Sequence, residues 1–164
     1  MKPIATLILM LTMALVTHAA LSAGRMDLHK FWDDRCLECH GHAAKFAREY
    51  LSVSNGKLVG RHHIENIRQF LGNHYLAESE VDSTYEMLLA QVSTQARFQN
   101  ECSECHNAAA DFARGSLEFR NGVLYGRESG KPITDFLNNH RKLQFNDVKF
   151  FSDLLIRVAR ETGL

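Results

Sequence analysis

The chain carries one sequence pattern twice, in two copies that are offset by 66 residues and align without a gap. About half of the positions in residues 36–74 are identical to those in residues 102–140. Identity at this level and at one fixed offset indicates a duplication, because chance periodicity would not keep register over so many positions. We therefore expect two like units in tandem, over residues 24–90 and 91–164.

The repeated positions fall into four groups. In the first copy they are Cys36-x-Glu38-Cys39-His40, Ala43-Ala44-x-Phe46-Ala47-Arg48, Asn55-Gly56-x-Leu58-x-Gly60-Arg61 and Ile67-x-x-Phe70-Leu71-x-Asn73-His74. The first group is Cys-x-x-Cys-His, and in the second copy it reads Cys102-Ser103-Glu104-Cys105-His106. All four cysteines of the chain lie in these two motifs.

Cys-x-x-Cys-His is the attachment motif of c-type haem. Cysteines three residues apart lie on one side of a helical turn, so both sulfurs can form thioethers with one porphyrin. The histidine that follows, His40 or His106, can then bind the iron as the proximal ligand. The sequence thus predicts two covalent haem c groups, attached through Cys36 and Cys39 and through Cys102 and Cys105.

Cys-x-x-Cys has three other interpretations. The four thiolates could form a tetrahedral zinc site, each pair could be a thioredoxin-like redox centre, or the cysteines could form a disulfide framework. None of these needs a histidine directly after the second cysteine of both copies. The βαβ pattern that accompanies a thioredoxin-like motif is also missing from the sequence.

The second axial ligand of each iron must come from elsewhere in the chain. His29, His42, His62 and His63 are not repeated, and their equivalents in the second copy are Gln95, Ala108, Glu128 and Ser129. His74 and His140 are repeated, each 34 residues after its proximal histidine. Met87 is the competing ligand in the first copy, but its equivalent is Asp153. We therefore expect bis-histidine ligation by His40 with His74 and by His106 with His140.

The N-terminus, residues 1–23, has the pattern of a secretory signal, with Lys2 before a short apolar run and small residues after it. Cleavage is expected in residues 20–23, and an uncleaved membrane anchor is the alternative. The run from Pro3 to Val16 is shorter than the roughly 20 residues that a spanning helix needs. Attachment of haem to Cys-x-x-Cys-His takes place outside the bacterial inner membrane, so both features predict the periplasm.

Each copy is expected to be mostly helical. Helices are predicted over residues 27–35, 43–51, 64–74, 81–98, 132–140 and 146–160. Asn55-Gly56 and Asn121-Gly122 predict tight turns, each between two short extended segments that could form a hairpin. A unit of this size has a small apolar core, so the porphyrin should supply much of it. The predicted haem-pocket residues of the first copy are Phe46, Phe70, Leu71, Leu88 and Leu89.

Each half resembles a shortened class I cytochrome c. The resemblance covers residues 27–164 and rests on Cys-x-x-Cys-His, on Leu-x-Gly-Arg and on a distal ligand before a C-terminal amphipathic helix. It implies an all-α fold of two tandem cytochrome c-like haem-binding units, with a small β-hairpin possible in each. Histidine stands where the family usually has methionine, and the ligand loop is shorter. The resemblance also implies that Arg61 and Arg127 bind haem propionates, whereas the alternative is that both are exposed turn residues.

These features predict a periplasmic dihaem cytochrome c that carries single electrons and is not an enzyme. Its partners would be redox proteins, among them a candidate membrane-bound oxidoreductase. Nucleic acid is excluded as a partner, since 19 basic and 19 acidic residues form no basic stripe. The alternatives are a peroxidase-like dihaem enzyme using His62 and His63, and a haem-based gas sensor in which His74 or His140 is displaced.

Overall fold

The computed structural model describes residues 25–61 and 64–164. The predicted signal segment, residues 1–23, lies outside the described residues, and so do His62 and His63. Helices predominate in the described part, and its strands form two short antiparallel hairpins. The expectation of a mostly helical fold with one small hairpin in each copy is confirmed at this level.

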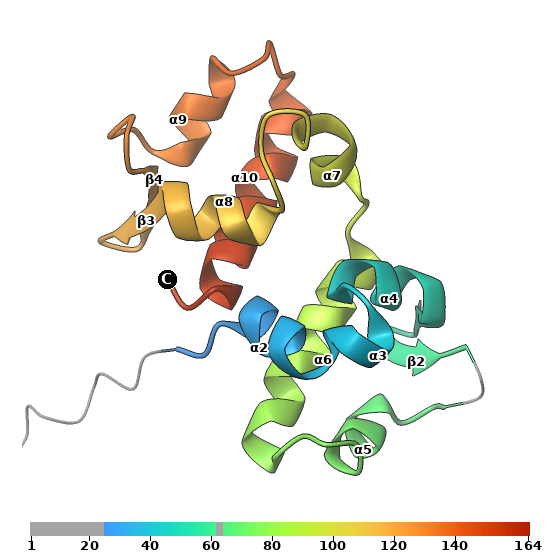
Figure 1. The fold of residues 1–164 in the computed structure, drawn as a ribbon. Coiled ribbons are helices and arrows are strands. Elements are labelled where there is room, and N and C mark those ends of the chain that lie inside the picture. Colours follow the sequence, from blue (N-terminus) through green and yellow to red (C-terminus); the bar gives the residue numbers. More distant parts are fainter. Residues whose placement is uncertain (1–24, 62–63) are drawn as a thin grey trace, which may run out of the picture.

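The two halves run through the same order of elements, and Figure 1 shows them as a lower and an upper group. The first half consists of α2 (Leu28–Arg35), α3 (Leu37–His40), α4 (Ala43–Tyr50), β1 (Leu51–Ser54), β2 (Lys57–Gly60), α5 (Ile67–Gly72) and α6 (Glu78–Ser93). The second half consists of α7 (Arg97–Cys102), α8 (Ala109–Ser116), β3 (Leu117–Arg120), β4 (Val123–Gly126), α9 (Ile133–Asn138) and α10 (Phe145–Glu161).

The 66-residue offset of the sequence is also the offset of the structure. It relates α4 to α8, β1 to β3, β2 to β4 and α5 to α9 at both ends of each element. The long helices α6 and α10 close their halves and start 67 residues apart. The duplication therefore holds for backbone conformation as well as for residue identity.

The prediction of one helix over residues 81–98 is wrong at its end. α6 ends at Ser93, because Thr94 adopts an extended conformation with ψ of 130°, and α7 begins at Arg97. The reason is packing: Leu88 on α6 lies in the hydrophobic core of the first half, and Phe98 on α7 lies in that of the second. The chain has to turn between these residues to reach both cores. The division predicted at residue 90 falls within α6.

The helix before each predicted distal ligand is shorter than expected. In α5, the Asn66 side chain accepts a hydrogen bond from the Gln69 amide at 3.0 Å, so the helix starts at Ile67 and not at residue 64. In α9, Pro132 is the N-cap residue, one position before the first helical residue. Both helices end two residues before the histidine. His74 and His140 therefore lie in the turns that follow the helices.

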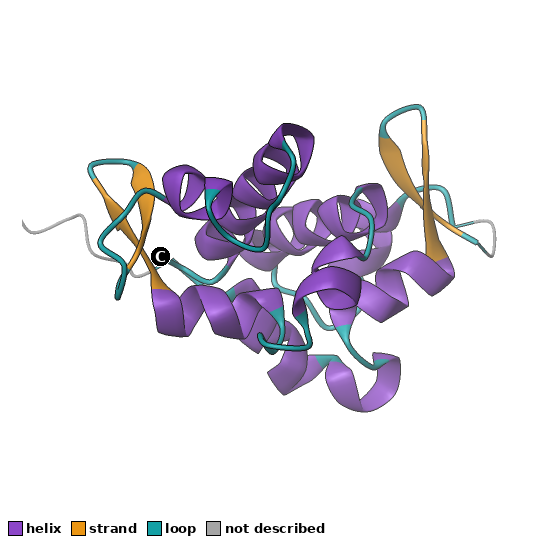
Figure 2. Ribbon diagram, turned by 90° about the horizontal axis from the view of Figure 1, so that it is seen from above, coloured by secondary structure: helices purple, strands orange, loops and turns teal. Residues whose placement is uncertain are grey.

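Both predicted hairpin turns are confirmed. Asn55 and Gly56 have φ values of 50° and 73°, and Asn121 and Gly122 have φ values of 50° and 80°. Positive φ at two successive residues is the type I′ geometry, whose twist suits a two-residue hairpin, and asparagine and glycine tolerate it best. Figure 2 shows the two hairpins at opposite ends of the molecule, with the helices between them.

Each half has its own hydrophobic core, built from equivalent residues. Strand residues Leu58 and Leu124 are each 1% exposed, and helix residues Ala47 and Ala113 are fully buried. The other buried pairs are Leu51 with Leu117, Ile67 with Ile133, Leu71 with Leu137 and Leu88 with Leu154. The long helix of each half covers this core from one side.

The two halves are in contact where the two ends of the described chain meet. The Arg114 guanidinium of α8 binds the Asp27 carboxylate at 2.6 Å and 3.1 Å, and His29 Nε2 lies 2.9 Å from Glu161 Oε2. Figure 1 shows the C-terminus beside α2. A Cβ atom added to Gly163 would lie 2.6 Å from the Arg25 carbonyl oxygen, so this contact is tight.

Candidate haem-binding sites

The first Cys-x-x-Cys-His motif spans the junction of α2 and α3. The amides of Cys39 and His40 both donate to the Cys36 carbonyl, at 3.2 Å and 2.9 Å. Buried Trp32 on α2 donates from Nε1 to the Gly41 carbonyl at 2.8 Å, which ties the end of the motif back to the helix before it. The Cys36 side chain is half-buried, whereas Cys39 is exposed.

The second motif repeats this geometry at the end of α7. The amides of Cys105 and His106 both donate to the Cys102 carbonyl, again at 3.2 Å and 2.9 Å. Cys102 is half-buried and Cys105 is exposed. All four thiols are free, and burial raises the pKa of Cys36 and of Cys102. In both copies the two cysteines are therefore one turn apart and available for thioether bonds.

Each predicted distal histidine faces the proximal histidine of its own half. The ring centroids of His40 and His74 are 5.8 Å apart, and those of His106 and His140 are 6.2 Å apart. An imidazole nitrogen binds a metal at about 2 Å and lies roughly 1 Å from its ring centre, so two imidazoles on one iron have centroids about 6 Å apart. The planes of the two pairs differ by 62° and 46°. Rotation of a ring about the nitrogen–iron axis keeps the nitrogen in place, so coordination does not require parallel planes.

Burial and proximity also favour the neutral imidazole in these pairs. Burial, followed by the nearby His74, holds the pKa of His40 below its usual value. Burial, followed by the charges of His106 and Arg141, does the same to the pKa of His140. A metal ligand has to be neutral to offer its lone pair, so this environment suits iron binding.

Phenylalanine rings flank all four histidines in the same way in both copies. Phe46 and Phe112 contact the proximal His40 and His106, with centroids 4.8 Å and 4.6 Å apart. Phe70 and Phe136 stack on the distal His74 and His140 at 4.9 Å and 5.0 Å. Phe70 is 41% exposed, so an apolar ring beside the histidine pair remains for a flat apolar group to cover.

The leucines predicted for the haem pocket lie in the core beside these rings. Leu71 and Leu88 are buried, and Leu89 packs against the same core as Cys36 and Phe46. Leu137, Leu154 and Leu155 are buried in the second half, in contact with the core that includes Cys102 and Phe112. The structure thus brings the predicted cysteines, histidines and apolar residues together separately in each half.

Arg61 and Arg127 directly follow the hairpins, and both are exposed. Their backbone amides make equivalent hydrogen bonds, to the carbonyls of Tyr50 and Ser116. Their side chains donate to other carbonyls, Arg61 to that of Arg48 at 2.9 Å and Arg127 to that of Leu117 at 2.7 Å. Binding of propionates by these arginines stays a prediction.

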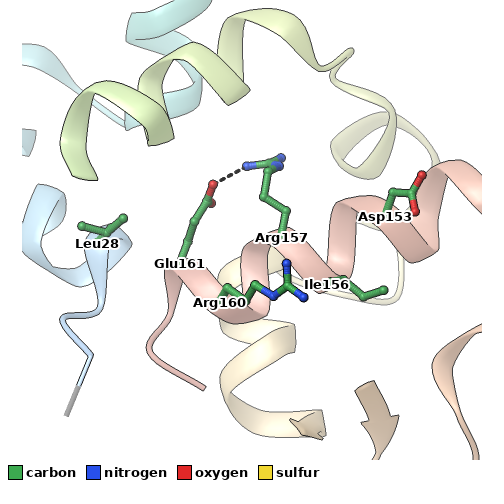
Figure 3. Close-up of a pocket in the computed structure, with 6 residues that line it drawn as sticks. All are labelled: Leu28, Asp153, Ile156, Arg157, Arg160 and Glu161. Atoms are coloured by element: carbon green, nitrogen blue, oxygen red, sulfur yellow. Dashed lines mark hydrogen bonds and ion pairs between the residues drawn. The ribbon is translucent and has the colours of Figure 1, made fainter. Parts of the chain in front are cut away.

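The unrepeated candidates lie away from the histidine pairs. His29 bridges to Glu161 of the other half, and exposed His42 lies 3.9 Å from Asp33. Met87 is buried and lines a hollow of about 480 Å³ between α6 and α10. A neighbouring hollow of about 420 Å³ lies along α10, and Figure 3 shows Leu28, Arg157 and Glu161 among its lining. Neither hollow is lined by a cysteine or a histidine.

A four-thiolate zinc site does not form. Within residues 25–61 and 64–164, no group of three or more histidine, cysteine, aspartate or glutamate side chains could hold a metal ion. The two cysteine pairs belong to different halves, so each site can offer iron only the two imidazoles. The porphyrin of a haem supplies the other four nitrogen ligands, and the donor set found here therefore fits haem better than a bare ion.

The residues after the distal histidines, Tyr75 and Arg141, were not singled out by the sequence analysis. Both have positive φ, 62° and 55°. Because they differ in type, they fall outside the repeated pattern, and a left-handed backbone at a tyrosine or an arginine has no clear sequence signal. The signal that could have drawn attention to them is their position, directly after the repeated histidine.

Comparison with protein-family models, with curated proteins and with solved structures gives no match to this chain. No helix within the described ranges is both long enough and apolar enough to cross a membrane.

Proposed function

We propose that this chain is a periplasmic dihaem c-type cytochrome that carries single electrons between redox proteins. One haem is attached through Cys36 and Cys39, with His40 and His74 as axial ligands. The other is attached through Cys102 and Cys105, with His106 and His140 as axial ligands. The observation that carries this proposal is the pair of facing imidazoles found in each half, at the separation that a shared iron requires.

Duplicate geometry adds weight to this assignment. A single pair of histidines near a Cys-x-x-Cys turn could arise by chance in a protein with many histidines. Here the motif hydrogen bonds, the imidazole separation and the flanking phenylalanines all recur in the second half. A common demand on both sites explains this recurrence, and one haem in each half is the demand that uses all of the repeated residues.

Axial ligation by two histidines determines the chemistry that we propose. Iron with two protein ligands has no vacant position at rest, which suits the transfer of an electron through the haem edge. Methionine ligation raises the potential of a haem in the cytochromes c, so both haems should titrate at lower potential than a histidine–methionine haem. We further propose that Arg61 and Arg127 bind the propionates, for which their exposed guanidinium groups are suited.

The proposal is tested by a redox titration of the holoprotein, followed by its visible and near-infrared spectra. We expect two one-electron steps, low-spin haem in both oxidation states and no methionine–iron charge-transfer band. Such a band, or high-spin iron in the resting protein, would contradict bis-histidine ligation. A chain without covalent haem would contradict the proposal as a whole.

A further inference from the structure

The two candidate sites differ at the residue that directly follows the distal histidine. Tyr75 follows His74, and Arg141 follows His140. The backbone is the same at both positions, because each residue has a left-handed φ, 62° and 55°. The difference between the two sites therefore lies in the side chain and not in the path of the loop.

In the second site, Arg141 ties the distal loop to the proximal motif. One guanidinium nitrogen donates to the Glu101 carbonyl at 2.9 Å, and another lies 3.5 Å from a carboxylate oxygen of Glu104. Glu101 directly precedes Cys102, and Glu104 lies inside the Cys-x-x-Cys-His motif. His140 and His106 are thus held on opposite sides of one site by a side chain that spans its edge.

In the first site, the equivalent residue is in solvent. Tyr75 is 91% exposed, and its ring meets only the edge of the His74 ring among the aromatic contacts of the described residues. The equivalents of the two acceptors are the Arg35 carbonyl and Glu38, so the groups that could hold an arginine are present here too. The Arg35 side chain itself is paired with Glu80 on α6 at 3.2 Å.

We propose that the first haem site exchanges its distal ligand for a small neutral molecule such as carbon monoxide, and that Arg141 prevents this exchange at the second site. The proposal rests on the haem ligation proposed above and adds ligand exchange to electron transfer. Displacement of His74 requires movement of a loop whose next side chain is free in solvent. Displacement of His140 also has to break the contacts of Arg141. One hydrogen bond to a charged group shifts such an equilibrium by about tenfold or more.

The exchange involves no redox step and no proton. The His74 nitrogen leaves ferrous iron with its lone pair, and the carbon atom of carbon monoxide donates its own lone pair in the same position. His74 remains neutral, which its half-buried position beside Phe70 and His40 favours. Arg141 is a positioning residue in this account, because it acts through the loop and does not touch the iron.

The test is the rate of carbon monoxide binding to the fully reduced dihaem protein. We expect a fast phase that accounts for one haem and a phase at least tenfold slower that accounts for the other. Arg141→Tyr should convert the slow phase into a fast one. Tyr75→Arg should convert the fast phase into a slow one, since Glu38 and the Arg35 carbonyl can receive the new guanidinium. Arg141→Lys is the matched control for charge and should release the slow phase only in part.

Haem content and redox steps, measured on the same samples, separate this proposal from the one on which it rests. Loss of a haem or of a redox step in the wild type would overturn the proposed function. With two haems and two redox steps intact, a single phase for both haems or no binding at all would overturn only the ligand exchange. Substitutions at Tyr75 and Arg141 that leave both phases unchanged would overturn it equally.

Discussion

Each of the four candidate iron ligands is positioned by its own backbone. The amides of His40 and His106 donate to a carbonyl of the motif at 2.9 Å, and those of His74 and His140 donate to Leu71 and Leu137 at 3.0 Å. These hydrogen bonds place all four Cα atoms, and the phenylalanine neighbours limit how far the rings can turn. The sites are thus built before any porphyrin is considered, which lowers the entropy cost of binding one.

At this scale we predict that the two distal ligands can be removed one at a time. His74→Ala or His140→Ala in the holoprotein should produce high-spin iron in half of the haem, because the two pairs share no residue. Electron paramagnetic resonance of the oxidised variants measures the high-spin fraction. His42→Ala is the control, since this exposed histidine lies outside both pairs, and it should leave the spectrum unchanged. High-spin iron in the control, or none in the two variants, would show that the ligands are assigned wrongly.

At the scale of elements, the hairpin turns bear most directly on stability. Gly56 has a φ of 73°, which an L-residue adopts only at a cost of roughly 1–2 kcal/mol. We predict that Gly56→Ala destabilises the holoprotein by about that amount in urea unfolding. Gly115 lies within α8 and a Cβ there would meet no atom within 4 Å. Gly115→Ala should therefore stabilise by about 0.5–1 kcal/mol through helix propensity. The same sign for both changes would contradict the turn geometry.

The elements also show how far the sequence could be interpreted in advance. The repeat and the Asn-Gly turns predicted the paired hairpins, and the spacing of histidines predicted which rings meet. The break at Thr94 could not be predicted, because Leu88 and Phe98 continue one helical pattern although they belong to different cores. The contact of Arg141 with Glu101 and Glu104 was equally out of reach, since it joins residues 37 and 40 positions apart.

At the scale of the whole molecule, the two halves close into a ring of contacts. Position 95 joins the copies covalently, and the 66-residue offset makes it equivalent both to His29 near the start and to Glu161 near the end. His29 and Glu161 are themselves in contact at 2.9 Å. The end of the second copy thus meets the start of the first at the place equivalent to the covalent junction. This is the arrangement expected of two like units related by an approximate two-fold axis.

The ion pair between the halves should make stability depend on pH. Burial by itself would raise the pKa of Asp27, but hydrogen bonds from Arg114 and the Lys30 amide hold it below its usual value. A lowered pKa in the folded state stabilises the protein above the unfolded value, about 4, and this stabilisation is lost as pH falls through the folded pKa. Asp27→Asn should therefore cost up to about 1 kcal/mol at pH 7 and much less at pH 3.

Urea unfolding of the holoprotein at both pH values measures this difference. Asparagine is a good N-cap residue, so the substitution keeps the start of α2 and removes mainly the pairing with Arg114. Asp34→Asn is the matched control, because Asp34 pairs with Lys30 on the exposed side of the same helix. A larger effect at pH 3 than at pH 7, or an equal effect of the control, would show that this contact does not join the halves.

The central claim is that every chain holds two haems, one in each half. The mass of the denatured protein, purified from cells that attach haem c, tests this most directly because thioether bonds survive denaturation. The account predicts two covalent haem increments in the wild type, and one increment when Cys36 and Cys39, or Cys102 and Cys105, are both replaced by serine. A wild-type mass with one haem or none would contradict it.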